Sequence, residues 1–182
     1  CYDIFRLETG RHAERRSAVA AEMQYNEDGT IQMLPYFQDC KLEQIEPLNP
    51  YRKVEAETIA WGYGLKTMPR RGHDTHSTNQ TVYDIDQDEF ILIKGIDFGK
   101  GAKAFKASAS VHLMGGSIEL HLDSKSGPMI GKLKVGNTKG EYKELSTSVK
   151  NAKGVHDLYL VFKGGDFQQR NLFYLDWWEF SK

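Results

Sequence analysis

Two hydrophobic runs near the end of the chain carry its strongest pattern. In residues 155–162, apolar side chains fall on both faces of an extended chain. Residues 172–180 are rich in aromatics, and alternation puts Trp177 on one face with Asp176 and Trp178 on the other. Strands that are apolar on both faces are typical of the centre of a sheet in a sandwich. The pattern therefore predicts two central strands here.

Shorter runs of the same kind recur before this pair. Their spacing, with glycine-rich turns between them, predicts a sandwich or barrel. No segment has a convincing helical period, so the expected class is all-β. The polar stretch 67–81 is expected to be a long loop. The predicted strands cover residues 53–58, 89–94, 102–111, 117–123, 129–135 and 142–149.

Residues 1–45 differ in pattern from the rest of the chain. Three short strands are expected, at 1–7, 16–25 and 31–34. The last two are joined by a tight turn at 26–30, in which Asp28-Gly29 supplies the positive φ. So few short strands cannot bury enough apolar area to offset their chain entropy. The segment therefore needs a partner. We predict a separate part over residues 1–45 and a main domain over residues 50–182, joined by a proline-containing linker.

Composition narrows the function. The chain has 182 residues and a net charge of −1, which gives no basic excess to neutralise phosphates and disfavours nucleic acid. No apolar run approaches the roughly 20 residues of a membrane span. Two cysteines, Cys1 and Cys40, make neither a disulfide scaffold nor a zinc pattern. The chain begins at Cys1 without Met, so we expect a fragment or a processed product.

Candidate chemistry is sparse. Neither a phosphate-binding glycine loop nor a catalytic triad can be assembled, so an enzyme is not expected. Glu55 and Glu57 lie on one face of a predicted strand, where they are either solvated or share a cation. Residues 164–171 mix amides, a guanidinium and the ring of Phe167, a combination suited to a neutral polyhydroxylated ligand.

Five motifs, in the right order, resemble carbohydrate-binding module family 6 over about residues 50–182. Residues 15–31 resemble the closing strands of the five-bladed propeller of glycoside hydrolase family 43. The combination suggests the tail of a xylan- or arabinan-degrading enzyme whose catalytic carboxylates lie outside this chain. The motifs are Val54-Glu-Ala-Glu57, Lys94-Gly-Ile-Asp-Phe-Gly99, Gly115-Gly-Ser-Ile-Glu-Leu-His-Leu-Asp123, Gly154-Val-His-Asp-Leu-Tyr-Leu-Val-Phe162 and Asn171-Leu-Phe-Tyr-Leu-Asp-Trp-Trp178.

The resemblance implies a β-sandwich jelly roll with a structural calcium ion. Glu55 and Glu57 match the acidic pair of the family's first strand, and Asp176 matches the acidic residue of its last strand. Carboxylates are the hard oxygen ligands that calcium takes. On this basis a shared cation is preferred to two solvated residues. The ion would clamp the first strand to the last.

The resemblance also implies a sugar site in the loops at one end of the sandwich, where two aromatic rings hold a sugar and an asparagine bonds its hydroxyls. Tyr83 and Tyr142 are the candidate rings, although they depart from the family pattern and are equally consistent with ordinary strand-end tyrosines. Asn171 is the candidate amide, with Trp61 and Phe167 as spare platforms. Some members use a second site on the concave face of the sandwich.

The function implied is non-catalytic binding of xylan or arabinoxylan, which holds an attached hydrolase on the plant cell wall. The alternative is an accessory module that has lost its sugar site and buttresses the hydrolase domain. A secreted, periplasmic or cell-surface location follows from either.

Overall fold

The computed structural model describes residues 21–34, 46–70, 79–113, 115–165 and 169–182. The chain divides into two compact units, Cys1–Ile45 and Glu46–Lys182. In the described part of the first unit, the predicted turn is present: the Asn26 amide donates a 2.8 Å hydrogen bond to the Thr30 carbonyl, and Gly29 has a φ of 80°. Among the described flanking residues, Tyr25 and Ile31 form a bridge. Residues 1–7 and 16–20, where strands were also predicted, lie outside the described residues.

The second unit consists of antiparallel strands and short connections, so the all-β prediction is confirmed. Its described residues contain no helix, and hence none that could cross a bilayer. The strands are β1 (Val54–Glu55), β2 (Trp61–Tyr63), β3 (Lys66–Pro69), β4 (Gln80–Tyr83), β5 (Phe90–Asp97), β6 (Ala104–Ser110), β7 (Gly116–Leu122), β8 (Met129–Val135), β9 (Tyr142–Ser148), β10 (Val155–Lys163) and β11 (Tyr174–Ser181).

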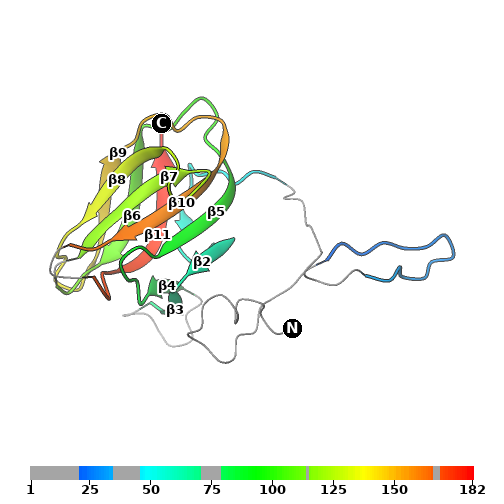
Figure 1. The fold of residues 1–182 in the computed structure, drawn as a ribbon, viewed down its shortest axis with the longest axis horizontal. Helices are drawn as coiled ribbons and strands as arrows, with labels where there is room; N and C mark the ends of the chain where they lie inside the picture. The colour runs from blue at the N-terminus through cyan, green and yellow to red at the C-terminus, as the bar shows by residue number, and fades with distance from the viewer. Residues whose placement is uncertain (1–20, 35–45, 71–78, 114, 166–168) are drawn as a thin grey trace. The chain divides into compact units, whose positions relative to one another are not determined.

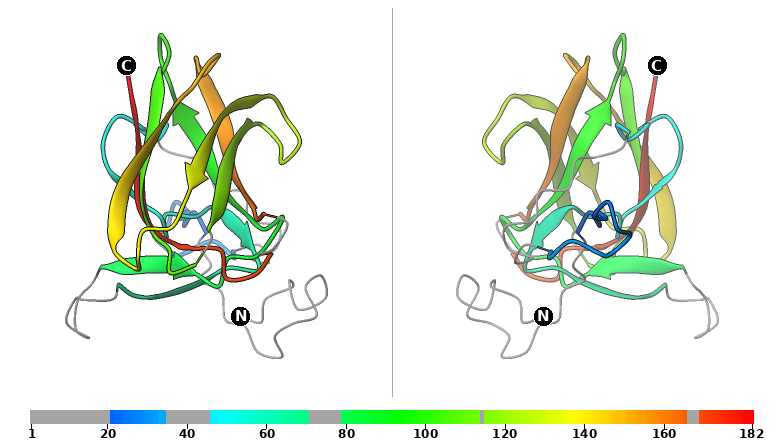
Figure 2. Two further views of the ribbon diagram at one scale, coloured as in Figure 1. Left: turned by 90° about the vertical axis from the view of Figure 1, so that its left-hand side faces the viewer. Right: turned by 90° about the vertical axis from the view of Figure 1, so that its right-hand side faces the viewer.

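The strands form two sheets that pack face to face (Figures 1 and 2). The first sheet has the order β3-β4-β11-β6-β9, with β1 also paired to β11. The second has the order β2-β5-β10-β7-β8. The two runs singled out in the sequence become β10 and β11, each inside its sheet as predicted. The result is the β-sandwich jelly roll that the sequence implied.

The core fills the space between the sheets. Leu158, Leu160 and Phe162 of β10 point inward and are fully buried, and β7 contributes its own alternate residues. From the other sheet, Trp178 stacks on Phe105 with ring centroids 6.3 Å apart. The described core residues all lie between Val54 and Phe180. The sandwich therefore has its own hydrophobic core.

Two details of the sequence prediction were wrong. The stretch 67–81 is not one long loop, because β3 and β4 occupy its ends and pair with each other. These strands are short and polar, so no apolar alternation marks them. In β11 the register shifts between Leu175 and Trp177, which leaves Asp176 in a bulge. Trp178, not Trp177, therefore joins Leu175 in the core.

Candidate functional site

Three carboxylates gather where β1 meets β11. Glu55 lies opposite Trp177 in the register, and the Ala56 amide donates a 2.9 Å hydrogen bond to the Asp176 carbonyl. This pairing brings Glu55 and Glu57 into the neighbourhood of Asp176. One buried oxygen of each side chain has no hydrogen-bond partner: Oε2 of Glu55, Oε2 of Glu57 and Oδ1 of Asp176.

Burial and mutual repulsion raise the free energy of the ionised carboxylates in this cluster. Burial raises the pKa of Glu57, and the carboxylates of Glu55 and Asp176 raise it further. Burial also raises the pKa of Asp176, against the opposing effect of Arg70, whose Nε lies 3.2 Å from Oδ2. Within the described ranges no three such side chains converge closely enough to hold an ion as they lie. Their unpartnered oxygens are nevertheless of the type that calcium binds.

Tyr142 lies in the same neighbourhood and not in the predicted sandwich of rings. The Arg70 guanidinium is 4.4 Å from its ring centroid. Its hydroxyl donates a 3.0 Å hydrogen bond to Thr81 Oγ1, and the Thr81 hydroxyl donates to the Leu175 carbonyl. One face of the Tyr142 ring is therefore already covered by a cation.

A small pocket does occur at the loop end of the sandwich. Its volume of about 190 Å³ is below the roughly 300–1,000 Å³ of typical ligand pockets. Tyr83 is not in its lining but stacks on Tyr174, with ring centroids 6.4 Å apart. Asn171 is in the lining, and its backbone N–H donates a 2.9 Å hydrogen bond to Oδ1 of Asp86. The lining is Asp84, Ser110, Val111, His112, Leu113, Asn171, Leu172, Phe173 and Tyr174.

A second group of aromatic side chains lies on the outer side of the second sheet. We call Trp61, Tyr63, Phe90 and Tyr159 the aromatic face. Cross-strand pairing forms it: Trp61 and Tyr159 both flank Leu92, and Tyr63 and Val161 both flank Phe90. The rings of Phe90 and Tyr159 are 5.8 Å apart at 37°. Of the four, Tyr63 is 42% exposed and the other three are partly exposed.

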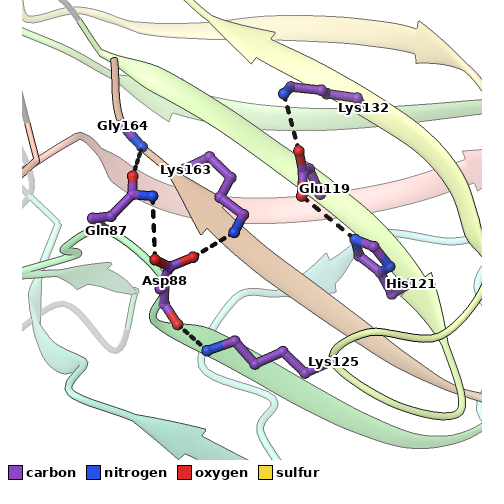
Figure 3. A network of polar contacts seen from close by, with 8 residues as sticks. All are labelled: Gln87, Asp88, Glu119, His121, Lys125, Lys132, Lys163 and Gly164. Atoms are coloured by element: carbon purple, nitrogen blue, oxygen red, sulfur yellow. Dashed lines mark hydrogen bonds and ion pairs between the residues drawn. The ribbon is translucent and has the colours of Figure 1, made fainter. Parts of the chain in front are cut away.

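Next to the aromatic face, on β7, β10 and the segment before β5, lie polar side chains that contact one another (Figure 3). Lys163 of β10 pairs with Asp88, whose pKa this contact lowers. Gln87 donates to the other Asp88 oxygen. On β7, Glu119 accepts a 3.0 Å hydrogen bond from Lys132 and lies 3.5 Å from His121. Held donors and acceptors beside exposed rings suit a ligand that presents both hydroxyls and C–H faces.

The sequence-predicted sugar residues are therefore dispersed. Trp61 belongs to the aromatic face, Asn171 lines the loop pocket and Tyr142 packs under Arg70. Phe167 lies outside the described residues. Tyr63, Phe90 and Tyr159 were missed as candidates. For Phe90 and Tyr159, alternation with the buried Ile91 and Leu158 could have marked them as outward-facing.

Comparison with known proteins decides the family. A family model described as carbohydrate binding module (family 6) matches residues 55–182. The chain belongs to carbohydrate-binding module family 6. It is accordingly a carbohydrate-binding module, and this family assignment confirms the resemblance seen in the sequence.

Relatives extend the match to residues ahead of the module. The chain is 38% identical to an arabinoxylan arabinofuranohydrolase of Paenibacillus polymyxa, over 98% of this chain and 28% of that enzyme. Among solved structures, a glycoside hydrolase family 43 arabinoxylan arabinofuranohydrolase from Bacillus subtilis in complex with cellotetraose matches with a TM-score of 0.80 and 38% identity, over 89% of this chain and 33% of that one. Residues ahead of the family 6 module thus match enzymes of family 43.

A solved module alone gives the same fold. The family 6 module from Clostridium cellulolyticum in complex with xylose matches with a TM-score of 0.67 and 31% identity, over 74% of this chain and 100% of that one. The chain spans about a third or less of the two arabinofuranohydrolases that it matches.

Proposed function

We propose that this family 6 module binds xylan-type plant cell-wall polysaccharide through the aromatic face. The observation that carries the proposal is the set of four outward rings on neighbouring strands β2, β5 and β10. Rings of this kind pack against the C–H faces of pyranose units. A sheet face spreads over several strand spacings of about 4.8 Å, so it can accommodate more than one sugar ring. The loop pocket is small by comparison.

The role proposed is targeting. A module that holds an attached hydrolase on an insoluble polysaccharide raises the enzyme's effective concentration there. The chain itself is proposed to be non-catalytic, and the attached enzyme to be of the arabinofuranosidase or xylosidase type, because its relatives are arabinoxylan arabinofuranohydrolases. Plant cell walls lie outside cells, so we propose that the protein is secreted, periplasmic or at the cell surface.

A structural calcium ion is proposed at the carboxylate cluster. Support comes from the three buried oxygens of Glu55, Glu57 and Asp176 that lack hydrogen-bond partners. Arg70 and Ser108 contact the other oxygen of Asp176, at 3.2 Å and 3.3 Å. Oδ1 of Asp176 thus stays available as a metal ligand. A bound ion would supply positive charge between the carboxylates and tie β1 to β11.

Affinity electrophoresis on wheat arabinoxylan and on xylan, with calcium present, tests the binding proposal. We expect the chain to be retarded. Trp61→Ala and Phe90→Ala should each weaken binding about tenfold, or roughly 1.4 kcal/mol, because a central ring is lost from the contact. Tyr174→Ala, which removes a ring from the loop pocket, is the matched control and should bind normally.

The reverse pattern, with Tyr174→Ala defective and Trp61→Ala normal, would move the site to the loop pocket. No retardation of the folded chain on any plant polysaccharide would overturn the binding proposal and leave the accessory-module alternative.

A further inference from the structure

Lysines gather at one side of the aromatic face. Lys163 of β10 lies opposite Ser117 of β7, and Ser117 lies opposite Lys134 of β8, so the three form one cross-strand row. Lys132 lies two residues before Lys134 and therefore projects from the same side of β8. Together with Lys125 from the β7–β8 turn, these residues form what we call the lysine margin: Lys125, Lys132, Lys134 and Lys163.

Contacts with the sheet hold three of these lysines in place (Figure 3). Lys125 Nζ donates a 2.6 Å hydrogen bond to the Asp88 carbonyl and lies 5.4 Å from the Phe90 ring centroid. Lys163 pairs with the Asp88 carboxylate, and Lys132 pairs with Glu119. The lysine margin as a whole has four lysines against two carboxylates, those of Asp88 and Glu119. The margin is therefore locally positive on a chain whose net charge is −1.

Lys134 differs from the other three. Its side chain is exposed, and its ammonium group makes no hydrogen bond or ion pair with another described residue. An ammonium group carries three donors and is a strong partner for a carboxylate. A neutral hydroxyl does not need an ammonium group as its hydrogen-bond partner. The unpaired ammonium of Lys134 is therefore better suited to a ligand that carries negative charge.

We propose that the lysine margin selects polysaccharides whose neutral backbone carries carboxylate substituents, of the uronic acid class. The backbone would lie on the aromatic face, and the substituent would reach Lys134 and Lys163. The inference rests on the proposed function of that face. Ion pairs at a solvent-exposed surface are weak and exchange readily, so Lys163 can share its ammonium between Asp88 and a ligand carboxylate.

The probe is glucuronoxylan, compared with the same polymer after chemical reduction of its carboxyl groups. At low salt the chain should bind the native polymer about fivefold more tightly than the reduced one, as measured by affinity electrophoresis. The ratio should fall toward one at about 0.5 M salt, because salt screens exposed charges. Lys134→Gln should lower the ratio about twofold, and Lys134→Glu should abolish it, without changing binding to the reduced polymer.

Lys143→Gln and Lys143→Glu are the matched controls, because Lys143 is an exposed lysine on β9 of the other sheet. Both should keep the full preference. Equal binding of the native and reduced polymers by the wild type would overturn this inference alone. An equal loss of preference in the Lys143 variants would also overturn it, because the effect would then be one of net charge. Binding to neither polymer would overturn the proposed function as well.

Discussion

Tyr142 belongs to a half-buried cluster with Arg70, Thr81 and Asp176, and its hydroxyl titration reports on that cluster. Burial raises the pKa of Tyr142 above the ordinary value of 10.0, and the nearby Asp176 carboxylate raises it further. Above pH 10 the unfolded chain therefore binds fewer protons than the folded chain. The stability that this phenol contributes is full below its unfolded pKa and is lost as pH rises.

Tyr142→Phe should accordingly lose less stability than the wild type between about pH 9 and about pH 11 in urea unfolding. At neutral pH the variant should be about 1 kcal/mol less stable, because the hydrogen bond to the buried Thr81 is gone. Tyr63→Phe, with its exposed ring, controls for loss of a phenol in general. An identical alkaline slope for Tyr142→Phe and the wild type would contradict the buried position.

At the same scale, the sequence located individual residues better than it located their partners. Trp61 was a candidate on its own, but its neighbours Phe90 and Tyr159 come from strands about 30 and 100 residues away along the chain. Strand register decides which rings meet, and register depends on pairing that a single sequence does not display. The contact between Tyr142 and Arg70 could not be predicted for the same reason. Arg70 directly follows β3, and β3 was not predicted.

At the scale of elements, β1 is only two residues long, yet it carries the carboxylate pair to β11. The role of its motif, Val54-Glu-Ala-Glu57, could be predicted only because the motif resembles the first strand of the family. The bulge at Asp176 could not be predicted from the alternation of apolar and polar residues, because that pattern assumes an unbroken period of two. That bulge is what breaks the alternation of Leu175 and Trp177 and leaves Asp176 buried next to Ser108.

Calcium should stabilise this junction. Calcium at a hundredfold excess over its Kd should add about 2.7 kcal/mol to the free energy of unfolding, and a chelator should remove that gain. Glu57→Gln should abolish most of the effect. Without metal, however, the variant should be at least as stable as the wild type, because it removes a buried charge whose pKa is raised by burial and by two carboxylates. Thermal melts with and without chelator measure both effects.

Glu144→Gln is the control, since Glu144 lies on the same sheet but pairs with Lys106. It should keep the full calcium response. A wild-type melt that calcium and chelator leave unchanged would contradict the metal proposal.

For the whole molecule, alternation and strand spacing predicted a sandwich or a barrel, and the family resemblance selected the two-sheet sandwich. Strands β5, β6, β7, β8, β10 and β11 each contribute buried apolar residues to the core, and in β7 and β10 these residues alternate along the strand. The strands β2 to β4 were not predicted because each has only three or four residues, too few to show a clear apolar alternation. Sheet order could not be read from periodicity, which fixes faces but not neighbours.

The division into two units leads to a test of independence. The described core comes wholly from residues 54–180, whereas the described part of the first unit exposes apolar side chains such as Met33, at 97%. The fragment 46–182 should therefore melt within about 2 °C of the full chain and bind polysaccharide equally, because removing residues 1–45 costs none of the described core.

The fragment 54–182 is the contrast. It loses Leu48, whose backbone exchanges hydrogen bonds with Gly95 and Asp97, and Pro50, whose carbonyl accepts from Phe180. That fragment should be about 2 kcal/mol less stable. A large loss already in 46–182 would show that the first unit supports the sandwich.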